Sequence, residues 1–203
     1  MAVSNAGFQP KVVLAVDMNS ISNDKVIAVT QLWLERAVIG LNLCPFANAV
    51  HTRKQIRYVV SVATHHEDLL HDLMRELEAL SETPAEKIDT TLLIHPAVLA
   101  DFIEYNNFLD VVDATLEDME LDGAVQVASF HPQYQFADTG PDDIENFTNR
   151  SPYPMLQLLR ESSMVRAVEA CPLAEQIFEK NIATLKKLGR TGWDELMNPE
   201  GKA

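Results

Sequence analysis

The chain has 203 residues, of which 47% are hydrophobic, and a formal net charge of −14 at pH 7. This composition suits one hydrophobic core, and without a basic patch the negative charge excludes nucleic acid and anionic membranes as partners. The two cysteines, Cys44 and Cys171, form no CxxC pair, so neither a disulfide framework nor a zinc ribbon is expected. The apolar run Val12–Val16 is too short for an export signal or a membrane span, which favours a cytoplasmic location.

The N-terminal 22 residues carry no sustained period and are expected to form a flexible arm, with at most a short strand at Val12–Val16. A helix should follow, because apolar residues recur at helical spacing from Val26 to Leu41 and Ser22 or Asn23 can cap its start. Residues 41–54 then form a loop that holds Cys44.

Three short apolar runs, at residues 55–62, 90–94 and 124–130, alternate with helical patterns. The first of these helices should begin at a capping box, Thr64 to Glu67, and the second should run from about Val98 to Glu117. Crossovers of this length favour parallel, right-handed connections. The predicted fold is therefore α/β, with a small, mainly parallel three-stranded sheet, one possible extra edge strand, and helices packed on it.

Two C-terminal helices are expected after these strands. Ser151-Pro152 has the pattern of a helix start and would open the first, which carries apolar residues from Met155 to Val165. The second would run from about 172 to 188 and end at Gly189. We therefore expect one α/β domain over residues 23–189 and a C-terminal tail at 190–203, with the last two helices as a possible homodimer surface.

A long irregular segment, His131 to Pro152, is the best candidate for a functional site. Loops this long are uncommon in compact domains and are usually functional or disordered. Its aromatic residues argue against disorder, since they can anchor the loop on the core while polar groups remain available for chemistry. These anchors are Phe130, Tyr134, Phe136 and Phe147.

Two of the predicted strands end in the same His-Pro dipeptide, at His95 and at His131. If the strands are parallel, both imidazoles lie at the carboxyl edge of the sheet, where open α/β folds bind their ligands. Each histidine can instead satisfy a local carbonyl, as single histidines at such positions commonly do.

Two further residues have alternative interpretations. Cys44 lies between apolar neighbours and is either an inert buried thiol or a nucleophile, and simple topology places it at the opposite edge from the histidines. Arg150 stands just before the predicted helix start, so its guanidinium and the helix N-terminus could bind one anion together. The alternative for Arg150 is an ion pair inside the loop, with Asp142, Asp143 or Glu145.

Three segments, at residues 40–47, 129–136 and 145–161, resemble a bacterial family catalogued as domain of unknown function 1415. The similarity extends from about Val26 to Gly189. It implies a compact, uncharacterised bacterial cytoplasmic protein and supplies no reaction, so no catalytic residue can be transferred.

The leading functional hypothesis is a small-molecule enzyme, a hydrolase or group-transfer enzyme acting on an anionic metabolite. His131 would be the general acid or base, with Cys44 or His95 as the nucleophile or second base. The predicted substrate-binding residues are Arg150, Asn149, Asn146, Tyr134 and Ser151. The cofactor is left open, and a metal-dependent version would use His95, His131 and a loop carboxylate such as Asp138 or Asp142. The alternative is a non-catalytic module that binds an anion or a partner segment.

Overall fold

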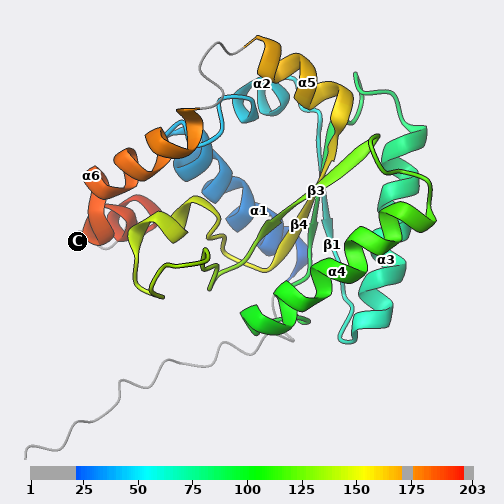
Figure 1. Ribbon diagram of the computed structural model, residues 1–203, viewed down its shortest axis with the longest axis horizontal. Helices are drawn as coiled ribbons and strands as arrows, with labels where there is room; N and C mark the ends of the chain where they lie inside the picture. Colours follow the sequence, from blue (N-terminus) through cyan, green and yellow to red (C-terminus); the bar gives the residue numbers. More distant parts are fainter. Residues whose placement is uncertain (1–21, 171–175, 199–203) are drawn as a thin grey trace, which may run out of the picture.

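Four strands form one mixed sheet in the order β1-β2-β4-β3. The computed structural model describes residues 22–170 and 176–198, and Figure 1 shows the sheet at its centre with helices on both sides. The strands are β1 (Ile56–Val60), β2 (Thr90–Ile94), β3 (Val125–Phe130) and β4 (Met155–Arg160). The α/β class is thus confirmed, and the sheet differs from the expected parallel one in its fourth strand.

The three predicted strands do run in the same direction, but they are not neighbours throughout. β1 and β2 pair in parallel, whereas β4 pairs antiparallel with both β2 and β3 and separates them. The prediction of a helix opening at Ser151-Pro152 is therefore wrong, because Met155–Arg160 is a strand in the middle of the sheet. Its apolar residues suit a strand covered on both faces as well as a helix face.

The helices lie in two layers. The α-helices are α1 (Asn23–Trp33), α2 (Ala47–Thr52), α3 (His66–Glu82), α4 (Phe102–Asp118), α5 (Glu161–Glu169) and α6 (Ile177–Met197). The π-helix η2 (Leu34–Ile39) continues α1, and the 3-10 helix η3 (Ile144–Thr148) lies in the long loop. In Figure 1, α3 and α4 lie on one side of the sheet and α1, α2 and α6 on the other. Each side has its own hydrophobic core.

The core between the sheet and α3 follows from a leucine stripe. Leu69, Leu73, Leu77 and Leu80 recur at helical spacing and are at most 1% exposed. Burying a leucine side chain stabilises the fold by roughly 1.5–3 kcal/mol before entropic costs. The stripe therefore fixes which face of α3 meets the sheet.

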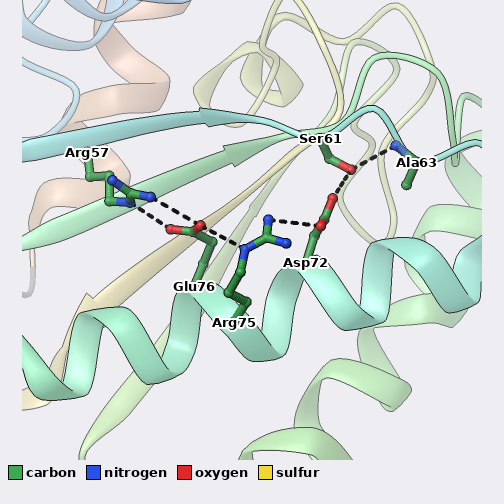
Figure 2. Close-up of polar contacts among 6 residues, drawn as sticks. All are labelled: Arg57, Ser61, Ala63, Asp72, Arg75 and Glu76. Carbon is green, nitrogen blue, oxygen red and sulfur yellow. Dashed lines mark hydrogen bonds and ion pairs between the residues drawn. The ribbon is translucent and has the colours of Figure 1, made fainter.

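A polar network holds edge strand β1 on α3, as Figure 2 shows. Arg57 binds the carboxylate of Glu76 through two hydrogen bonds, of 2.7 and 3.3 Å. Ser61 donates to Asp72 at 2.6 Å and accepts from the backbone amide of Ala63. These contacts give the edge strand a polar attachment in addition to the leucine stripe.

Several helix boundaries differ from the predictions. Ser22 caps α1 as expected, but α3 is capped by His65 without a side-chain hydrogen bond, so the predicted capping box at Thr64 does not form. Helix α4 begins only at Phe102, after Asp101 accepts two amides as its cap. Helix α6 continues past its break at Gly189 to Met197, so part of the predicted tail is helical.

Some predictions concern parts of the chain that the structure leaves undescribed. The N-terminal arm with its possible strand at Val12–Val16 and the position of Cys171 lie outside the described residues. Within residues 22–170 and 176–198, no helix has the length and apolarity needed to cross a membrane.

Candidate functional site

The two strand-end histidines meet at one edge of the sheet, as predicted. His95 follows β2 and His131 follows β3, and both are 0% exposed. Tyr105 of α4 contacts both rings, with centroid distances of 5.8 Å to His95 and 5.0 Å to His131. The three rings form one buried cluster on the α4 side of the sheet.

Both ring nitrogens of His131 are used inside the protein. Nδ1 accepts the backbone amide of Gln133 at 3.0 Å, so the proton is on Nε2, which donates to the carbonyl of Leu99 at 3.1 Å. Leu99 has a positive φ of 57°, a backbone conformation that is uncommon for a leucine. Burial lowers the pKa of His131. This imidazole is neutral and has no nitrogen left for a substrate.

His95 is equally enclosed. Its Nδ1 donates to the carbonyl of Val98 at 3.0 Å, and its Nε2 is a buried acceptor without a partner among the described residues. Burial lowers the pKa of His95 to about 4. The histidine pair thus shares an edge of the sheet, but it is sealed among aromatic rings.

Arg150 has a different role from the predicted anion clamp. The helix N-terminus that was expected to follow Arg150 is absent, because the next element, Met155–Arg160, is a strand. The guanidinium donates to the backbone carbonyls of Tyr134 and Pro141 and lies 4.4 Å from the centre of the Phe147 ring. The alternative interpretation, an ion pair with a loop acid, is not seen among the described residues either, and the backbone contacts tie the two halves of the loop together.

The other predicted binding residues of the loop also have internal partners. Asn146 is 0% exposed, accepts from the amide of Phe136 and donates to the carbonyl of Gly140. Ser151 donates to the carbonyl of Tyr153, and the ring of Tyr134 packs against Phe136. The loop is therefore ordered by its own polar groups, most of which form hydrogen bonds with other groups of the loop.

Cys44 lies on the other side of the sheet from His131. It packs against the core that contains Phe130, and successive strand residues face opposite sides, so His131 faces away from it. Burial raises the pKa of the Cys44 thiol. The structure therefore does not bring the predicted nucleophile and base together.

A cavity of about 690 Å³ opens on the Cys44 side of the sheet. Its floor is formed by the strands, and its walls by η2, α2, α5 and the end of the long loop. Most of its lining is apolar. The residues that line it include Trp33, Leu34, Val38, Leu43, Cys44, Phe46, Ile56, Leu92, Ala128, Phe130, Gln157, Leu159, Met164 and Ala167.

The polar groups of the cavity come from several elements. Its charged residues are three arginines, Arg53, Arg160 and Arg166, and one aspartate, Asp89. The lining is thus net positive in a chain whose formal charge is −14. Of the predicted site residues, Cys44 and Asn149 line the cavity, and Asn149 also donates to the carbonyl of Ser129 at 3.1 Å.

Sequence reasoning missed the residues that give this cavity its polarity. Gln157 was assigned to a helix, although a lone glutamine between leucines becomes a signal once the segment is treated as a buried strand. Arg53 and Arg166 come from separate helical regions, and no local motif links them.

Metal ligation has no support in the arrangement of side chains. Among the described residues, no three His, Cys, Asp or Glu side chains are grouped closely enough to hold a metal ion. The metal-dependent version of the enzyme hypothesis therefore lacks a ligand set in this part of the chain.

Most of the chain matches a protein-family model. The family model described as "Protein of unknown function (DUF1415)" matches residues 25–195. No curated protein and no solved structure matches the chain.

Proposed function

The chain belongs to the DUF1415 family, and we propose that it binds a small organic anion with an apolar body in the cavity on the Cys44 side of the sheet. The single observation that carries this proposal is the 690 Å³ cavity itself, whose volume falls within the range of about 300–1,000 Å³ found for small-molecule sites. Apolar walls with a few polar groups are also typical of such sites.

The charge of the lining supports an anionic ligand. Arg160 is occupied by the carbonyls of Leu80, Thr83 and Ile88, so its guanidinium is committed to the fold. Arg53 and Arg166 are exposed residues at the cavity. Arg166 donates to the Ser163 hydroxyl at 2.9 Å, and its other N–H groups remain able to face a ligand. An anion would gain from these two guanidiniums, whereas a cation would not.

The arrangement favours binding over catalysis. A hydrolase or transferase needs a nucleophile or a general base within hydrogen-bond reach of its substrate. Cys44 lines the cavity, but burial raises the pKa of its thiol, and neither His95 nor His131 is among the lining residues. The non-catalytic alternative to the enzyme hypothesis is therefore the proposal that the geometry supports best.

Titration with the fluorescent anion 6-(p-toluidino)naphthalene-2-sulfonate tests the proposal. Ala128 lies on the cavity floor, so the indole of Ala128→Trp should occupy the centre of the cavity and strongly weaken binding, while Ala124→Trp, at an exposed position just before β3, should not. Both variants need an unchanged circular dichroism spectrum. If the wild-type protein does not bind the anion, or if Ala128→Trp binds it normally, the proposal is wrong.

The arginines are tested with the same titration. The double variant Arg53→Gln, Arg166→Gln should bind the anion about tenfold or more weakly, because it loses two cationic contacts. Its matched control is Lys25→Gln, Lys187→Gln, which removes two exposed positive charges that do not line the cavity. Equal weakening in both double variants would show that net charge, and not the site, attracts the anion.

A further inference from the structure

Gln157 is a polar side chain in the middle of an otherwise apolar cavity floor. It lies at the centre of β4, opposite Leu92 of β2 and Ala128 of β3, and all three residues line the cavity. Strand positions facing an apolar core rarely carry an amide unless its hydrogen bonds are provided for. The protein provides a hydrogen-bond partner for the amide nitrogen of Gln157.

Thr90 fixes the orientation of the Gln157 amide. The Thr90 hydroxyl donates its only proton to the carbonyl of Leu158 at 2.7 Å, so toward Gln157 it can only accept. The amide nitrogen of Gln157 occupies that position, 3.2 Å from the Thr90 oxygen. A flipped amide would place two acceptor oxygens against each other. Thr90 is 3% exposed, which limits competition from solvent.

This arrangement turns the amide oxygen of Gln157 away from Thr90. No hydrogen bond to that oxygen is made by any residue of the described chain. It is an oriented acceptor on a rigid central strand, which is how specificity is usually provided in an apolar pocket.

We propose that this oxygen selects the ligand by accepting a hydrogen bond from an N–H or O–H group in the ligand's apolar body. The inference rests on the proposed function and narrows its ligand class to organic anions that also carry such a donor. The ligand's anionic group would face Arg53 and Arg166, because the guanidinium of Arg160 is committed to carbonyls on the α3 side of the sheet.

Two probes of the same shape test this selection. One is 6-(p-toluidino)naphthalene-2-sulfonate, whose amine N–H and sulfonate are attached at opposite ends of the naphthalene ring system. The other is its aryl ether analogue, in which oxygen replaces the N–H group. Isothermal titration calorimetry should show that the wild-type protein binds the amine about tenfold more tightly, because the ether leaves the Gln157 acceptor unpaired.

Three variants identify the group responsible. Gln157→Met, which keeps the length of the side chain and loses the acceptor, should bind both probes with similar affinity. Thr90→Val should reduce the preference, since the amide then turns freely. Gln126→Met is the matched control on neighbouring β3, because Gln126 does not line the cavity, and it should keep the full preference.

The outcomes separate this inference from the proposed function. If the wild-type protein binds both probes equally, or if Gln157→Met keeps the preference, the selection by Gln157 is refuted while cavity binding stands. The comparison of the two probes uses only the wild-type protein, so the inference can be refuted even if a variant fails to fold. If neither probe binds the wild-type protein, the proposed function fails and this inference fails with it.

Discussion

The imidazole of His95 is stacked on the ring of Tyr105, with 5.8 Å between the ring centroids and 17° between the ring planes. The Tyr105 hydroxyl in turn donates to the carbonyl of Met155 and accepts the amide of Phe130. One side chain of α4 therefore joins the ends of β3 and β4 and packs against His95 at the end of β2. This cluster is part of the framework of the protein, which has consequences for its stability in acid.

Acid should destabilise the protein through its buried histidines. Burial lowers the pKa of His95 to about 4 and also lowers the pKa of His131, whereas both are near 6.5 in an unfolded chain. The unfolded state therefore binds protons first as the pH falls, so the stability present above pH 6.5 is lost progressively toward pH 4. For His95 alone the free energy of unfolding should drop by about 2 kcal/mol between pH 7.5 and pH 5.

Urea denaturation at the two pH values measures this effect, and pH 5 stays above the range in which most carboxylates titrate. In His95→Asn, the amide can replace the Nδ1 donor without titrating, so the variant should lose less stability than the wild type on going to pH 5. His71→Asn, at an exposed position of α3, is the control and should behave like the wild type. Identical pH dependence in all three proteins would contradict the prediction.

The three strands and the long helices between residues 23 and 130 could be predicted from hydrophobic patterns and segment lengths, whereas the short helix α2 falls in the stretch 41–54 that was predicted as a loop. The shared edge of His95 and His131 followed from the common direction of β2 and β3, which the structure confirms because both strands run antiparallel to β4. By contrast, the run from Met155 to Leu159 is apolar except for Gln157, and such a short run does not distinguish a buried strand from a helix. That one ambiguity also produced the incorrect helix N-terminus beside Arg150.

The cavity could not be predicted, for a different reason. Arg53, Gln157 and Arg166 lie in three separate segments, and only tertiary packing brings them around one hollow. The long loop was predicted to be the site because long ordered loops are usually functional and this one carries polar groups between aromatic anchors. In the structure, Asn146 and Arg150 use those polar groups to hold the loop itself. Sequence patterns indicate which groups are polar, whereas their partners depend on the fold.

Asn146 should be the residue on which the long loop depends. Its side chain accepts from the amide of Phe136 at 3.0 Å and donates to the carbonyl of Gly140 at 2.7 Å. Asn146→Ala leaves these partly buried groups without the Asn146 side chain and should lower the free energy of unfolding by about 2–3 kcal/mol. Hydrogen exchange should accelerate within residues 136–146 before it does in the strands. Asn106→Ala, at an exposed position of α4, should leave both quantities nearly unchanged.

The ion pair between Arg57 and Glu76 should be strongly coupled. Glu76 is 2% exposed in its side chain, so Arg57→Met leaves a buried carboxylate with only Arg75, at 3.6 Å, to compensate it. We expect Arg57→Met to lower the free energy of unfolding by about 2 kcal/mol. Breaking a fully buried ion pair would cost more, but the Arg57 side chain is 43% exposed and solvent screens its charge.

A double-mutant cycle in urea checks this coupling. Arg57→Met combined with Glu76→Met should be less destabilised than the sum of the two single variants, because no charge is then left unpaired. Arg75→Met is the comparison, and it should cost at most about 1 kcal/mol, since its side chain is 60% exposed. Additive single effects would mean that the contacts in Figure 2 contribute little beyond packing.

Cys44 should react slowly with thiol reagents, and a ligand in the cavity should slow it further. Burial raises the pKa of its thiol, so at pH 7.5 the reactive thiolate is scarcer than in an unperturbed cysteine. The rate of reaction with 5,5′-dithiobis(2-nitrobenzoate), measured in a Cys171→Ser background, reports on Cys44 alone. It should fall below the rate of the same protein in urea, and fall again when 6-(p-toluidino)naphthalene-2-sulfonate is added, because Cys44 lines the cavity. Fast reaction in the folded protein would contradict the burial, whereas a rate unaffected by bound probe would place that probe outside the cavity.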